Sequence, residues 1–86
     1  MKDMFGNELS VGDIVCYYQS NKGLSMFFSR VVQLQNVGAK VVRLARTSSE
    51  GCQMLNEKQV STIKSGANAL IIRDQQLIQR LTAENV

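Results

Sequence analysis

The side chains best suited to chemistry in this chain are cations in its central third. They are Arg30, Lys40, Arg43 and Arg46. Arg30 lies in one strand-like run and the other three lie in the next, and neighbouring strands are only about 5 Å apart. Clustered cations bind nucleic acid because each neutralised phosphate releases condensed counterions. Strict alternation places Arg43 on the face opposite Lys40 and Arg46, so an ordinary solvated face of a cationic domain is the alternative interpretation.

Two adjacent aromatic pairs are the second candidate feature, since exposed rings stack on the bases of single-stranded nucleic acid. The pairs are Tyr17–Tyr18 and Phe27–Phe28. Neighbours along a strand face opposite sides, so one ring of each pair should face the core. Tyr18 and Phe28 share their parity with the better apolar partners. Tyr17 and Phe27 are therefore predicted to be the exposed, stacking rings, and the alternative is that most of the four lie in the core or at its rim.

No residue pattern in the chain indicates catalysis. Histidine, the commonest general base and metal ligand, does not occur. The carboxylates are scattered, and two of them have structural explanations, Asp13 in a turn and Asp74 as a helix cap. Phosphate-binding glycine loops and metal-ligand spacings do not occur either. The sequence therefore predicts a protein that is not an enzyme, with no catalytic residue, metal or cofactor.

The two cysteines, Cys16 and Cys52, lack the close spacing of a zinc or redox motif. Cys16 alternates with Ile14 and Tyr18, which indicates a small buried apolar residue. A disulfide would require the fold to bring the two thiols together, and disulfides are rare in cytoplasmic proteins.

Composition sets the class of protein. The chain has 86 residues, 44% of them hydrophobic, which is enough for one small globular domain. A net charge of +3 permits a polyanionic partner without requiring one. No apolar run approaches the roughly 20 residues of a membrane-spanning helix, and the first residues lack a signal-peptide core. These features predict a cytoplasmic protein without a membrane partner.

Alternating apolar residues and turn signals predict a series of short strands. The first follows a corner at Gly12-Asp13, where glycine supplies backbone freedom and aspartate can bond to neighbouring backbone. The predicted strands are 13–19, 24–35 with an internal bend or bulge, 39–47, 52–55 and 69–72. The predicted turns are 20–23, 36–38, 48–51 and 56–59, and residues 60–63 are predicted as a 3₁₀ turn or strand end. The core should include Ile14, Val31, Val42 and Leu44.

A C-terminal helix is predicted over residues 74–84. Asp74 is a good N-cap, and Leu77, Ile78 and Leu81 form one apolar stripe. So short a helix is marginal alone. The stripe must cover the chain's own strands, or it must dock a partner or a second copy. We expect it to pack on its own strands, because an exposed stripe on so small a protein favours aggregation.

Three segments together resemble the small SH3-like barrels, including the KOW-type nucleic-acid modules. They are Leu9-Ser10-Val11-Gly12-Asp13-Ile14-Val15, Arg30-Val31-Val32-Gln33-Leu34 and Lys40-Val41-Val42-Arg43-Leu44. The start, Asp3-Met4-Phe5-Gly6-Asn7-Glu8-Leu9, is similar to uncharacterised small barrel proteins of tailed phages. The resemblance covers roughly residues 3–63. It departs from the KOW pattern at Ser29-Arg30-Val31, where glycine usually precedes the valine.

The resemblance implies a mainly β fold, a single SH3-like domain over residues 1–86. A barrel of about five strands would occupy about 9–73 and the helix about 74–84. It implies a small non-enzymatic nucleic-acid-binding accessory module, phage-encoded and acting in the host cytoplasm. The candidate nucleic-acid-binding residues are Arg30, Lys40, Arg43, Arg46, Tyr17 and Phe27. The alternative is a module that binds and modulates a host or phage enzyme, through Leu77, Ile78 and Leu81. Either would be a monomer or a homodimer that binds DNA, RNA or a protein.

Overall fold

The structure is a computed structural model that describes residues 1–19, 25–48 and 51–83. Five strands, one 3₁₀ turn and one helix follow in order. They are β1 (Ile14–Gln19), β2 (Ser25–Leu34), β3 (Ala39–Ser48), β4 (Gly51–Ile63), η1 (Gly66–Asn68), β5 (Ala69–Ile71) and α1 (Gln75–Ala83). The mainly β fold with a C-terminal helix is confirmed. The predicted turn at 20–23 and residues 49–50 of the one at 48–51 lie outside the described residues.

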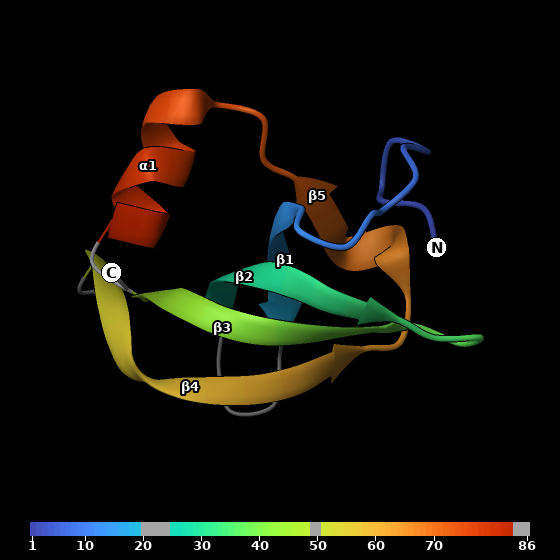
Figure 1. The fold of residues 1–86 in the computed structure, drawn as a ribbon, viewed down its shortest axis with the longest axis horizontal. Helices are drawn as coiled ribbons and strands as arrows, with labels where there is room; N and C mark the ends of the chain where they lie inside the picture. Colours follow the sequence, from blue (N-terminus) through green and yellow to red (C-terminus); the bar gives the residue numbers. More distant parts are fainter. Residues whose placement is uncertain (20–24, 49–50, 84–86) are drawn as a thin grey trace.

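The strands form one antiparallel sheet in the order β4-β3-β2-β1-β5. Strands β1 to β4 follow one another as a meander, and β5 returns to pair with the free side of β1. Figure 1 shows β2, β3 and β4 as curved ribbons side by side, with α1 above one end of them. The predicted bend in the second strand is confirmed, because the pairing of β2 with β3 shifts register between Phe28 and Ser29 and again between Val31 and Gln33.

The turn predicted at 56–59 is wrong, since β4 is one continuous strand, and residues 60–63 form the strand end that was one of their two predicted states. Both halves of β4 pair with β3: Met54 lies opposite Ala45, and Gln59 lies opposite Arg43. More residues separate Met54 from Gln59 than separate their partners. Residues 56–59, predicted as a turn, therefore lie inside the strand, where its pairing with β3 is irregular. Strand β3 is long enough to pair with both halves of β4.

The corner before β1 has the predicted geometry. Gly12 has a φ of 96°, a left-handed value that favours glycine. Its N–H donates to the Val31 carbonyl at 2.8 Å, and the Val31 N–H donates to the Asp13 carbonyl at 2.9 Å. The Asp13 carboxylate accepts from the Ser10 N–H at 2.8 Å. These bonds connect the corner to the middle of β2.

Buried side chains form two clusters. One contains Leu9, Val15, Tyr17, Phe27, Val31, Ala39, Val41, Ile63, Ala69 and Ile71. The other contains Ile14, Leu44, Ala45 and Leu81. Ile14, Val31 and Leu44 are buried as predicted, but Val42 is only half-buried. Its neighbour Val41 takes the core position, because Val41 lies opposite the buried Val31 in the register of β2 and β3.

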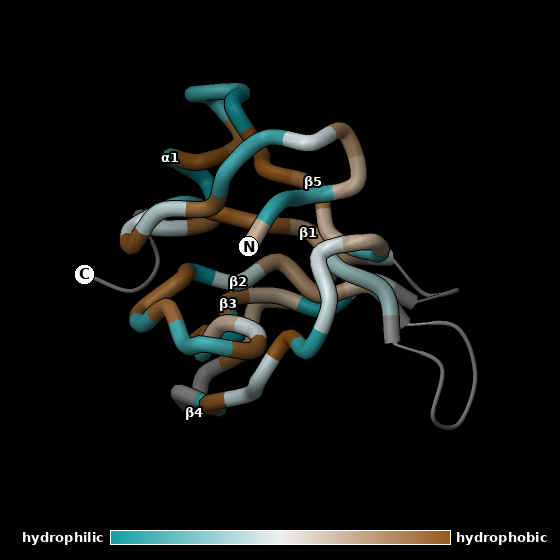
Figure 2. The backbone as a smooth tube through the Cα atoms, turned by 90° about the vertical axis from the view of Figure 1, so that its right-hand side faces the viewer, coloured by the Kyte–Doolittle hydropathy of each residue, from teal (hydrophilic) through white to brown (hydrophobic). Residues whose placement is uncertain are grey.

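Helix α1 covers the second cluster. Asp74 caps it as predicted: its carboxylate accepts from the N–H groups of Gln76 at 3.0 Å and Leu77 at 3.4 Å. Leu81 is buried against β1 and β3 residues, and Leu77 and Ile78 pack at the edge of the same cluster. In Figure 2 the apolar turns of α1, drawn brown, lie on its side nearer the sheet. The apolar stripe is therefore packed on the chain's own strands.

The N-terminal segment is held by a buried carboxylate that the sequence did not single out. Asp3 accepts from the N–H groups of Phe5 and Asn7, both at 2.9 Å, and from the N–H of Ile71 in β5 at 3.2 Å. Burial raises the pKa of this carboxyl, but the hydrogen bonds from Asn7, Ile71 and Phe5 outweigh it and hold the pKa below its usual value. Asp3 therefore connects the first residues to the end of the sheet.

We expect Asp3→Asn to destabilise the fold at neutral pH and to reduce its sensitivity to acid. A carboxyl whose pKa is lowered by folding contributes stability above its unfolded pKa, near about 4, and loses it as the pH falls through the lower folded value. Urea unfolding at pH 7 and in acid measures this. The urea midpoint should fall less from pH 7 to acid for Asp3→Asn than for the wild type. An equal fall in both proteins would contradict this role for Asp3.

Candidate functional site

The four cations predicted to form one group are divided between the two faces of the sheet. Arg43 lies opposite Ser29 and Arg46 opposite Phe27, two positions that share one face of β2. In the pairing of β3 with its neighbours, Leu44 is an extra residue without a partner, which makes a bulge. Because of this bulge, Arg43 and Arg46 share one face although they are three residues apart. The strict alternation that was assumed from the sequence, which placed Arg43 and Arg46 on opposite faces, is therefore wrong at this bulge.

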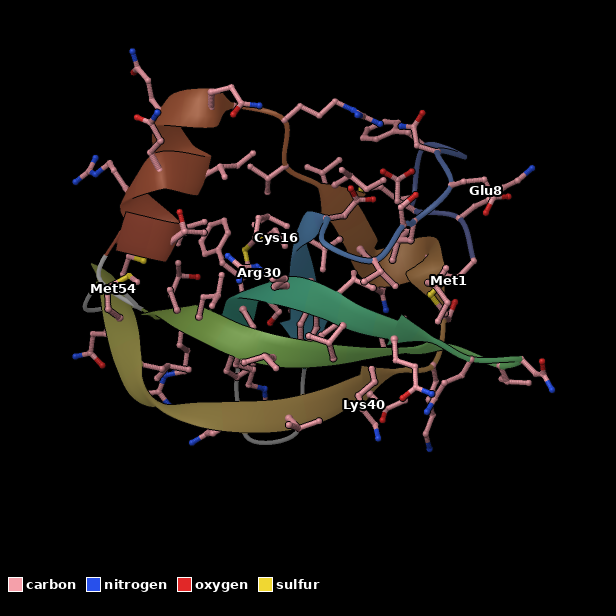
Figure 3. The ribbon with its side chains drawn as sticks, in the orientation of Figure 1. Met1, Glu8, Cys16, Arg30, Lys40 and Met54 are labelled. Atoms are coloured by element: carbon pink, nitrogen blue, oxygen red, sulfur yellow. The ribbon has the colours of Figure 1, made fainter. Side chains whose placement is uncertain are left out.

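Arg30 and Lys40 belong to the other face. Arg30 lies opposite Ile14 and Val42, and Lys40 lies opposite Gln33 and Thr62. Figure 3 shows Arg30 near Cys16 above the middle of the sheet, whereas Lys40 lies on the side of β4. The four cations therefore do not form one patch.

Arg43 is the most constrained of these cations. Its guanidinium lies 4.0 Å from the centre of the Phe27 ring, and its Nε donates to the Tyr17 hydroxyl at 3.1 Å. Its Nη1 and Nη2 reach Gln59 Oε1 and Ser61 Oγ, both at 3.4 Å. The side chain is half-buried. Arg43 therefore fixes the inner aromatic rings and the end of β4 as much as it supplies charge.

The prediction that Tyr17 and Phe27 are the exposed rings is wrong. Tyr17 is 5% exposed and Phe27 is 8% exposed, and their rings stack with centroids 5.6 Å apart. Tyr18, by contrast, is 41% exposed, and Phe28 packs against the cluster under α1. Tyr17 shares its face with the buried residues Val15 and Val31. The better apolar partners therefore lie on the face of Tyr17 and not, as assumed, on the face of Tyr18.

A pocket of about 400 Å³ opens beside this cluster. It lies between the end of β1 and the segment that connects β4 to β5, and its lining is Tyr17, Tyr18, Thr62, Ile63, Lys64, Ser65 and Asn68. Ser65 caps η1, since its hydroxyl oxygen accepts from the Ala67 N–H at 3.2 Å. Tyr17 belongs both to the pocket and to the hydrogen bond with Arg43. The pocket and the Arg43 cluster therefore share a wall.

The pocket lining combines two tyrosine side chains, an ammonium group, the aliphatic hydroxyls of Thr62 and Ser65, and an amide. Tyr18 supplies the exposed ring and Lys64 the cation, and no carboxylate occurs among the lining residues that the structure describes. Sequence reasoning missed Lys64 and Asn68, since both lie in a break between strands with no periodic signal. The pairing of β4 with β3 before this break and of β5 with β1 after it brings the break against the two tyrosines. The arrangement can accept a flat ligand that carries negative charge.

The other candidate residues do not form a reactive site. Leu77, Ile78 and Leu81 are packed on the sheet. Both cysteines have free thiols, with Cys16 buried and Cys52 exposed, and burial raises the pKa of the Cys16 thiol. Among the described residues, no three His, Cys, Asp or Glu side chains lie close enough to hold a metal ion. Within the same residues, no helix is both long and apolar enough to cross a membrane.

Comparison with known proteins places the chain in a family. The model of a family described as a domain of unknown function matches residues 1–70. The chain belongs to this family, DUF7205. The matched segment contains the whole pocket lining and Arg43, and it ends before α1. No curated protein and no solved structure has significant similarity to the chain.

Proposed function

We propose that this DUF7205 chain is a non-enzymatic accessory module that binds nucleic acid, built on an SH3-like barrel. The strand order supports the barrel, because β5 returns to β1 after a four-stranded meander. Two register shifts between β2 and β3 and one between β3 and β4 support it as well, because such irregularities bend strands as a small barrel requires.

The observation that carries the proposed function is the pocket beside Arg43. Proteins that bind single-stranded nucleic acid combine exposed aromatic rings with cations. The rings stack on the bases, and the cations contact the phosphate backbone. Tyr18 supplies the ring and Lys64 the charge, and Arg46 lies exposed on the same face as Arg43. The net charge of +3 favours approach of a polyanion from any direction.

Binding of labelled DNA and RNA oligonucleotides, followed by fluorescence anisotropy over a range of salt, tests this function. Affinity should fall steeply with salt, and Lys64→Ala and Arg46→Ala should each reduce the slope of log K against log salt by about 1. Arg80→Ala is the matched control, since this exposed residue of α1 carries the same charge away from the pocket. Wild-type protein that binds neither DNA nor RNA at low salt would rule out the proposal.

The second candidate function is a module that binds a host or phage protein. It is favoured by exposed apolar side chains in the N-terminal loops and along the hairpin of β2 and β3. They are Met4, Phe5, Val11, Val32, Leu34 and Val37, of which Phe5 is 73% exposed. Such a partner would use this surface rather than the stripe of α1, which the sheet already covers. Failure of all nucleic-acid binding at low salt would favour this function.

A further inference from the structure

We infer that the pocket holds a single unpaired nucleotide, with its base against the Tyr18 ring and its phosphate at the Lys64 ammonium. This inference rests on the proposed function and narrows it to single strands. It assigns a ligand class to the pocket between β1 and the segment from Thr62 to Asn68.

The exposed ring sets the preference for a single strand. Tyr18 is 41% exposed and borders the pocket, so its ring is accessible to a ligand there. In a duplex each base is already covered by its neighbours and paired at its edge. Only an unpaired base can leave the stack and lie against a side chain at the wall of a pocket.

The wall of the pocket that Tyr17 forms is held in place before any ligand binds. Tyr17 forms part of the lining, and its hydroxyl accepts a hydrogen bond from Arg43 while its ring stacks on Phe27. The Arg43 guanidinium in turn lies over Phe27 and reaches Ser61, the residue before Thr62 in β4. Arg43 is therefore a positioning residue that joins the two walls, and a preorganised pocket loses less freedom on binding.

The polar groups fit the remaining parts of a nucleotide. Among the described residues of the lining, Lys64 is the one cation and no carboxylate opposes it, so this part of the pocket favours an anion. The Asn68 amide offers both a donor and an acceptor, which suits the polar edge of a base. The hydroxyls of Thr62 and Ser65 can each donate or accept, so they do not restrict the pocket to one base. The expected recognition is therefore tolerant of sequence.

Affinities for oligothymidylate and for a blunt DNA duplex of the same length test the inference. The wild type should prefer the single strand. Tyr18→Leu should lower single-strand affinity about 5- to 150-fold, the range that corresponds to loss of one stacked base, and should leave duplex affinity unchanged. Tyr18→Phe keeps the ring and should bind as the wild type does. Equal affinity for strand and duplex, with no effect of Tyr18→Leu, would overturn the inference and leave general nucleic-acid binding intact.

A second measurement needs no variant and no oligonucleotide. Thymidine monophosphate added to the labelled wild-type protein should shift the backbone amide resonances of Tyr18, Lys64 and Asn68 more than those of α1. Shifts confined to other segments would overturn the assignment of the pocket. Absence of binding to every nucleic acid at low salt would instead overturn the proposed function itself, so the two failures are distinguishable.

Discussion

Leu81→Ala is expected to destabilise the protein by about 2–5 kcal/mol, the range for truncating a buried leucine. Leu81 is 2% exposed and completes the cluster of Ile14, Leu44 and Ala45 under α1. The helix has only nine residues and is too short to be stable without this packing. Loss of the side chain should therefore loosen α1 and expose the β1 and β3 residues beneath it.

Thermal unfolding measures this effect, since about 1 kcal/mol corresponds to roughly 4–8 °C in a domain of this size. Gln79→Ala is the matched control, because this exposed residue lies in the same helix and its change should leave the melting temperature within a few degrees. A Leu81→Ala protein that melts as the wild type does, but no longer self-associates or binds a partner, would show that the stripe is a docking face.

The elements that sequence reasoning located correctly are those with a local chemical signal. The corner at Gly12-Asp13, the hairpin at Gly38 and the cap at Asp74 each depend on one or two residues that act on their own backbone. The alternation that marks β1 and β3 is likewise local. Such features are predictable because no distant part of the chain is needed to produce them.

The site was harder to predict because long-range pairing determines it. One extra residue, Leu44, moves Arg46 to the face of Arg43. Both faces of β1 are covered, one by the inner cluster and the other by α1, so alternation alone did not show which ring of Tyr17–Tyr18 would be exposed. Lys64 joins the pocket because β4 pairs with β3 and β5 then returns to β1. None of these three arrangements can be predicted from the residues of one local segment.

Gly38→Ala is the second substitution with a large expected effect. Gly38 ends the turn between β2 and β3 with a φ of 99°, where an L-residue is strained by about 1–2 kcal/mol. An added Cβ would also overlap the carbonyl oxygen of Ile63 at the end of β4. That oxygen belongs to backbone and cannot rotate away, because Ile63 is paired with Ala39, the residue after the glycine. Overpacking of this kind lowers the stability by about 1–3 kcal/mol more.

Gly12→Ala separates the two contributions. Gly12 has nearly the same φ, 96°, but nothing lies within 4 Å of the position that its Cβ would occupy. Both alanine variants should therefore carry the same backbone strain, and only Gly38→Ala should also carry the overlap with Ile63. Denaturant unfolding should rank them wild type, Gly12→Ala, Gly38→Ala in order of falling stability, with the last lower by about 2–5 kcal/mol in total. Equal losses in the two variants would mean that β4 does not approach the hairpin turn as closely as the structure shows, and the wall of the pocket formed by Thr62 and Ile63 would then lie elsewhere.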